Sequence, residues 1–210
     1  MSTTINYSYD YYLRNAYSSN RNARKSENRP TMNSKDLIQA DSDAVKKITE
    51  KLRELEYSSD NASEILTNAK MFVETYNNLV ESTGSSTSDS IDKIKSKITQ
   101  LSKNNKDELE SLGITMNASG KLSLDKSKFG ECSPSKIERF FGRDSDFMDT
   151  VRSYSMQAKR SARRLVEEQN NEEGNQTKKI TPNTTANAEA ELLESLLAHP
   201  ETNGTFDAKS

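Results

Sequence analysis

The residue types that carry most enzyme chemistry are scarce in this chain of 210 residues. It contains one cysteine, Cys132, and one histidine, His199, and the two lie far apart in the sequence. A single cysteine cannot form an intrachain disulfide or a thiolate metal cluster, and a catalytic nucleophile needs an adjacent base. No glycine-rich phosphate loop occurs, and the spacing of the carboxylates singles out no acid and base pair. The sequence therefore predicts a protein that is not an enzyme and that uses no metal or other cofactor.

One short segment has part of the spacing of a calcium-binding loop. Asp125, Ser127 and Gly130 fall at positions one, three and six of such a loop. Phe129 and Lys136, however, take positions five and twelve, where calcium requires oxygen ligands. We interpret the segment as a helix cap followed by a turn.

A basic run is the candidate for contact with nucleic acid. Its cations are Arg152, Lys159, Arg160, Arg163 and Arg164. The run has no interleaved aromatic residue beyond Tyr154 and no known binding motif, and acidic residues follow from Glu167. Because cations are favourable near the C-terminal end of a helix, the pattern favours a solvated helix end over a nucleic-acid site.

The composition limits how much of the chain can fold and what it binds. Hydrophobic residues make up 31% of the chain and charged residues 30%, and the mean hydropathy is −0.93. Such a chain has too little apolar surface to order every segment, so we expect disordered tails. The net charge of −2 favours protein partners over nucleic acid or a membrane surface. No apolar run is long enough for a membrane span or a cleavable signal peptide, and no small-molecule substrate is indicated.

The pattern divides the chain into three parts. Residues 1–33 are rich in tyrosine, asparagine and arginine, and we expect a flexible arm. Residues 34–168 carry the apolar periodicity of a helical core. Residues 169–210 are polar, and we expect a disordered linker that contains one short amphipathic helix at 188–198.

Three amphipathic helices open the predicted core. The first begins after Ser34 or Ser42 and ends near Tyr57, and the second begins at Asp60 or Asn61. The third follows a serine-rich loop at residues 81–90. Their apolar residues recur at steps of three and four: Val45, Ile48, Leu52 and Leu55; Ala62, Leu66, Ala69, Val73, Tyr76 and Val80; Ile91, Ile94, Ile98 and Leu101. Short seams of this kind are typical of a helical bundle or a short coiled coil.

The pattern then changes from helical periodicity to alternation. Residues 112–124 alternate around the turn residues 117–120, which predicts a β-hairpin. Asp125 can cap a short helix, Pro134 can open another, and a last helix is expected over residues 144–168. The predicted fold class is mainly α, a small helical bundle with one short β-hairpin and disordered N- and C-terminal tails.

Two segments of this core resemble a known protein family. Residues 72–80 read FVETYNNLV and residues 109–125 read LESLGITMNASGKLSLD, and Ile137, Phe140 and Phe141 follow them. In order, spacing and helix–hairpin–helix context, residues 61–154 resemble the C-terminal region of flagellar hook-associated protein 2, the filament cap of the bacterial flagellum.

The resemblance implies a structural protein that assists flagellin assembly on the growing filament. It also implies an extracellular location, reached through the flagellar export channel without a cleavable signal peptide. The implied partners are flagellin or other flagellar axial proteins, a second copy of the chain, or an export chaperone. The long terminal helix and the large variable domains of the family are missing, so a reduced accessory paralogue fits as well. The alternative is a cytoplasmic helical adaptor or regulator whose basic helix contacts nucleic acid.

By the same resemblance, contacts with partners would use the helical seams and the aromatic pair that follows the hairpin. The expected interaction residues are Phe72, Val73, Tyr76, Asn77, Val80, Ile94, Ile98, Leu101, Phe140 and Phe141.

Overall fold

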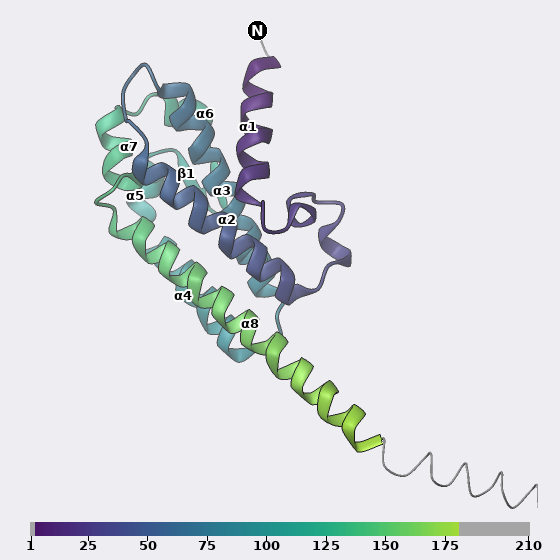
Figure 1. Cartoon of the computed structure of the whole chain (residues 1–210). Helices are drawn as coiled ribbons and strands as arrows, with labels where there is room; N and C mark the ends of the chain where they lie inside the picture. The colour runs from purple at the N-terminus through teal and green to yellow at the C-terminus, as the bar shows by residue number, and fades with distance from the viewer. Residues whose placement is uncertain (1–2, 181–210) are drawn as a thin grey trace, which may run out of the picture. The chain divides into compact units, whose positions relative to one another are not determined.

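The computed structural model describes residues 3–180 of the chain, and it describes side chains over residues 9–172. The compact unit in which all the sites below lie ends at Val166. The elements follow one another as α1 (Thr3–Ala16), η1 (Arg21–Arg24), η2 (Arg29–Thr31), α2 (Ser34–Glu54), α3 (Ala62–Gly84), α4 (Asp89–Asn104), α5 (Lys106–Ser111), β1 (Ile114–Met116), β2 (Leu122–Leu124), α6 (Lys126–Gly130), α7 (Pro134–Phe141) and α8 (Asp146–Ile180). The predicted bundle with one hairpin is confirmed, and Figure 1 shows the helices side by side.

Helices α2 and α3 form the central pair of the unit. Asn33 caps α2, because its side chain accepts a hydrogen bond from the backbone N–H of Lys35 at 2.9 Å. The pair runs in opposite directions, since Lys51 near the end of α2 pairs with Glu64 near the start of α3 at 3.0 Å. Most of the seam that the sequence predicts for each helix is buried, whereas Leu55 and Leu66 are half-buried and Ala62 is exposed.

A cluster of phenylalanine rings joins α7 and the start of α8 to α3. Phe140 and Phe147 stack with ring centroids 4.6 Å apart, and Phe72 meets Phe141 edge to face at 5.5 Å. The three rings Phe72, Phe140 and Phe141 are almost completely buried. Aromatic pairs in these geometries add to the free energy of area burial, so this cluster holds the short helix α7 in place.

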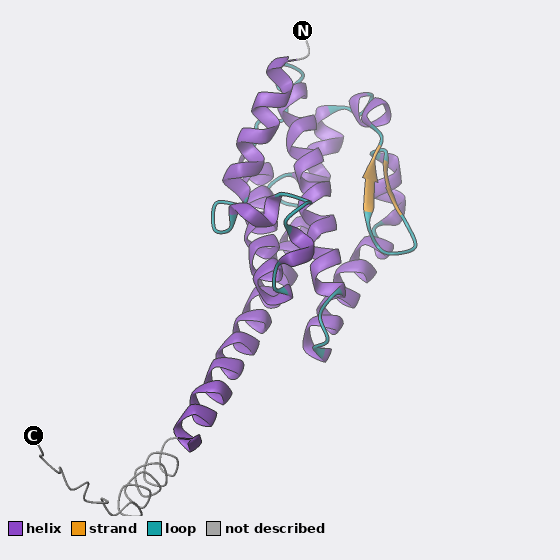
Figure 2. Cartoon of the chain, turned by 90° about the vertical axis from the view of Figure 1, so that its right-hand side faces the viewer, coloured by secondary structure: helices purple, strands orange, loops and turns teal. Residues whose placement is uncertain are grey.

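The hairpin lies against the side of the helices (Figure 2). Strands β1 and β2 pair antiparallel, with Thr115 opposite Ser123. In the turn, the side-chain oxygen of Asn117 accepts hydrogen bonds from the backbone N–H of Ser119 and of Lys121. Gly120 has a positive φ of 84°, which L-residues with a side chain rarely adopt. The predicted turn residues therefore act as expected.

The prediction of a flexible arm over residues 1–33 is wrong for residues 9–33, here called the N-terminal segment. Leu13, Tyr17 and Ala23 are buried in the common core, and α1 contacts both α2 and α3. The segment carries few aliphatic residues, so its composition resembles that of a disordered arm. Its aromatic residues nevertheless recur at helical spacing with Leu13 and Ala16 and pack on the core, and buried polar bonds from Tyr17 and Arg29 add to this contact.

The predicted end of the core helix at residue 168 is also wrong, because α8 continues to Ile180. Residues 167–173 are glutamate, glutamine and asparagine. Extending an existing helix through such residues requires no new nucleation, whereas starting a helix there would. The short helix predicted at residues 188–198 lies outside the described residues.

Replacing Gly120 by alanine should destabilise the protein. The added Cβ would overlap Thr99 Cγ2 on α4, and the positive φ strains any residue with a side chain. We expect a loss of about 2 kcal/mol in the free energy of unfolding by urea. Gly130→Ala is the matched control, because nothing lies within 4 Å of its added Cβ, and it should leave the stability unchanged. Equal effects of the two variants would contradict this account of the turn.

Candidate interaction site

The side chains expected to contact partners lie mostly inside the core. The residues Phe72, Tyr76 and Val80 of α3, Ile94 and Ile98 of α4, and Phe140 and Phe141 of α7 are each at most 6% exposed, and Val73 is 9% exposed. Leu101 and Asn77 are half-buried. The prediction that these side chains form a partner surface is therefore corrected for the folded chain, because their apolar atoms already contact one another. Periodicity reveals which residues are buried, and it does not distinguish an internal seam from an external one.

Asn77 has a different role, because its side chain links α3 to the hairpin by two hydrogen bonds. Its side-chain nitrogen donates to the carbonyl oxygen of Leu122 at 2.8 Å, and its side-chain oxygen accepts from the N–H of the same residue at 2.7 Å. The amide thus satisfies both outward-facing backbone groups of β2 at this position, as a neighbouring strand would. Tyr76 also makes a polar contact with a distant segment, because its hydroxyl is hydrogen-bonded to that of Ser102 on α4 at 2.7 Å.

A buried ion pair holds the N-terminal segment on α2. The Arg29 guanidinium donates two hydrogen bonds to the Asp41 carboxylate, each at 2.9 Å, and a third to the carbonyl oxygen of Ala23 at 2.8 Å. Asp41 is completely buried and Arg29 is 8% exposed. Burial opposes the charged form of Arg29, but the bonds and the charge of Asp41 outweigh it and raise the pKa of the guanidinium.

Tyr17 and Asn78 extend this pair into a network across three segments. The Tyr17 hydroxyl donates to Asp41 at 3.0 Å and accepts from the side-chain nitrogen of Asn78 at 2.8 Å. Burial, followed by the charge of Asp41, raises the pKa of the Tyr17 hydroxyl well above its usual value. Sequence reasoning missed these residues, although one signal was present. Asp41 interrupts the apolar seam of α2 between Ile38 and Val45, where a lone charge needs a buried partner.

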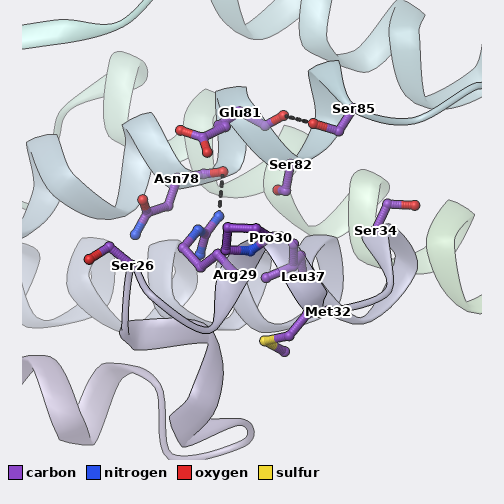
Figure 3. Close-up of a pocket in the computed structure, with 10 residues that line it drawn as sticks. All are labelled: Ser26, Arg29, Pro30, Met32, Ser34, Leu37, Asn78, Glu81, Ser82 and Ser85. Carbon is purple, nitrogen blue, oxygen red and sulfur yellow. Dashed lines mark hydrogen bonds between the residues drawn. The ribbon is translucent and has the colours of Figure 1, made fainter.

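Beside the network lies a pocket of about 400 Å³, shown in Figure 3. Its walls come from the N-terminal segment, the start of α2 and the end of α3, and they comprise Ser26, Arg29, Pro30, Met32, Ser34, Leu37, Asn78, Glu81, Ser82 and Ser85. Glu81 accepts a hydrogen bond from Lys121 at 2.6 Å, which lowers the pKa of its carboxyl group. Arg29 reaches the carbonyl oxygen of Asn78 at 3.3 Å, and its Nε has no partner within the described residues.

The polar side chains of this pocket are four serines, Arg29, Asn78 and Glu81. Its serine hydroxyls have no adjacent imidazole or unpaired carboxylate that could serve as a base. Cys132 is half-buried on another part of the unit, where its thiol donates to the carbonyl oxygen of Lys128 at 3.3 Å. His199 lies outside the described residues. Among the residues that the structure describes, no three histidine, cysteine or acidic side chains gather to hold a metal ion.

The basic run of α8 is partly used within the fold. Arg152 donates to Glu50 at 2.7 Å and Lys159 pairs with Asp43 at 2.6 Å, and both acids lie on α2. These two cations therefore hold α8 on α2 and are not fully available to an anionic ligand. No helix in the described range is both long and apolar enough to cross a membrane.

Comparison of the chain with known protein families, with curated proteins and with solved structures finds no match.

Removing one member of the buried pair should be strongly destabilising. Arg29→Met would leave the Asp41 carboxylate buried without its cation, and we expect a loss of about 3–5 kcal/mol in the free energy of unfolding, measured with urea. Arg14→Met is the control, because Arg14 pairs with Asp10 in an exposed i, i+4 contact of the kind that barely affects stability. A loss in Arg29→Met no larger than in Arg14→Met would contradict the role of this pair.

Stability should also fall at high pH because of Tyr76. Burial raises the pKa of its hydroxyl to about 12, and a bond to Ser102 partly opposes the shift. Above the usual tyrosine pKa the unfolded chain loses this proton and the folded chain retains it, so stability decreases as pH rises. The variant Tyr76→Phe lacks this titrating hydroxyl. Between pH 9 and 11, its free energy of unfolding should therefore fall by about 1 kcal/mol less than that of the wild type. A pH profile of Tyr76→Phe equal to that of the wild type would contradict this role of Tyr76.

Proposed function

We propose that this chain is a non-catalytic interaction protein of the bacterial flagellum, similar to the C-terminal region of the filament cap. It acts as a cap-like or reduced accessory protein that assists flagellin assembly. Its proposed partners are flagellin or other axial proteins, a second copy of the chain, or an export chaperone. Its proposed location is the flagellum, and the cytoplasm if it is a regulatory paralogue.

The observation that carries the proposal is the bond between Asn77 and Leu122. The two segments that resemble the family, residues 72–80 and 109–125, are packed together as one unit by the paired hydrogen bonds of the Asn77 amide. Gly120, in the turn next to Leu122, packs against Thr99 of α4 and adds a second contact at the same end of the hairpin. This contact supports the proposal, because the resemblance then concerns one packed helix–hairpin unit and not two separate stretches of sequence.

The burial of the helical seams changes where partner contacts are proposed. Because the seams are occupied by the chain's own core, partners would contact the outer surface of the unit. The outer face of the hairpin, with Thr115 and Ser123 exposed, is part of that surface.

The proposal predicts where the protein is found in its own host. A tagged chain should be recovered with sheared flagellar filaments and should capture flagellin or another axial protein after mild cross-linking. The variant Asn77→Ala leaves both backbone groups of Leu122 without their partner, so it should keep its helical content but capture less of the axial protein. Asn104→Ala, at an exposed helix end, is the control and should capture as much as the wild type.

Two results would overturn the proposal. One is recovery of the chain in the cytosol with unrelated proteins and none of the flagellar export or axial proteins. The other is salt-dependent binding of the purified chain to DNA or RNA, which would favour the cytoplasmic regulator instead.

A further inference from the structure

A second pocket, of about 600 Å³, lies between α1, α2 and α3 and is open to solvent. It shares no lining residue with the pocket beside Arg29. The charged side chains that line it all belong to α2, and they are Lys47, Glu50, Lys51 and Glu54. Seven residues complete almost two turns of a helix, so Lys47 and Glu54 lie on one face, about 10 Å apart along the axis. These four residues, here called the charged face of α2, carry no net charge.

The two ends of the charged face have no ion-pair partner in the described part of the chain. Glu54 is exposed and forms no ion pair there. The Lys47 ammonium donates to a backbone carbonyl and to a serine hydroxyl of the N-terminal segment, and neither group carries a charge. The two middle residues are paired within the fold, yet the Glu50 side chain is still 39% exposed and that of Lys51 41%. All four charges can therefore meet a partner surface.

The order of the charges on this face is self-complementary. Along α2 the signs run plus, minus, plus, minus, and the same series read backwards has every sign inverted. Two copies of α2 that run in opposite directions about a two-fold axis therefore place Lys47 opposite Glu54 of the second copy, and Glu50 opposite its Lys51. Each of the four cross pairs is attractive. A parallel arrangement in register would put like charges together, so the pattern also selects the orientation.

Tyr11 adds an apolar group to the same surface. It is 67% exposed at the α1 side of the pocket, more than any other large hydrophobic side chain that the structure describes. In a two-fold contact the same residue comes from both copies, so each Tyr11 ring can enter the pocket of the other copy. A tyrosine ring brings much contact area at little cost in conformational entropy. It therefore supplies the attraction that exposed ion pairs alone do not.

We propose that the charged face of α2 and the ring of Tyr11 form a two-fold contact with a second copy of this chain. The exposed ion pairs set the antiparallel orientation and the register, and the two rings add apolar contact. The contact is weak, because exposed ion pairs contribute little and salt screens them. This inference does not depend on the flagellar proposal, because it rests on the charge pattern of α2, and a monomeric chain would leave that proposal intact.

The test measures the association of the full chain by sedimentation equilibrium. The wild type should form a dimer whose dissociation constant rises at least fivefold between about 50 mM and about 500 mM salt. Lys47→Glu and Glu54→Lys should each abolish the dimer, because each turns two cross pairs repulsive. A wild type that stays monomeric up to its solubility limit, or a dimer that is indifferent to salt, would overturn the proposal.

Mixing the two variants separates charge complementarity from damage to the fold. One chain with Lys47→Glu and one with Glu54→Lys restore both attractive pairs between them, so an equimolar mixture should form a heterodimer although neither variant dimerises alone. Glu56→Lys makes the same charge change at an exposed position outside the pocket, and it should dimerise as the wild type does. Tyr11→Ala should weaken the dimer at least threefold. Absence of the heterodimer, or unchanged association of Tyr11→Ala, would refute the assignment.

Discussion

Arg29 and Asp41 bring two full charges into a part of the unit from which water is almost excluded. Either charge alone would be very unfavourable there, so each is tolerated because the other is present. The pair lies where the N-terminal segment meets α2, and Tyr17 and Asn78 extend it to α3. The pair therefore anchors the N-terminal segment on α2, together with the buried side chains of Leu13, Tyr17 and Ala23.

The rest of the unit is held by apolar and aromatic packing, with polar bonds at selected joints. Phenylalanine rings hold α7 and the start of α8, and the Asn77 amide holds the hairpin. Ion pairs from Arg152 and Lys159 hold α8 on α2. Because most of these joints link residues far apart in sequence, the unit should lose its structure cooperatively and not one helix at a time.

The pocket beside Arg29 offers hydroxyl groups and one paired carboxylate, and it does not bring a nucleophile next to a base. The apolar seams predicted from the sequence are mostly filled by the chain's own core. Under the proposed function, partners would therefore contact the outer surface of the unit.

The sequence by itself determined the central helices, the hairpin, the cap at Asp125 and the helix that begins at Pro134. These features follow from local periodicity, turn residues and caps, which act between near neighbours. Only the tertiary structure decided that residues 9–33 are packed, that the seams face inward, and that the basic run is partly paired. Those outcomes depend on partners such as Asp41 for Tyr17 and Glu50 for Arg152, which are 24 and 102 residues away. A local pattern carries no information about which distant group will meet a side chain.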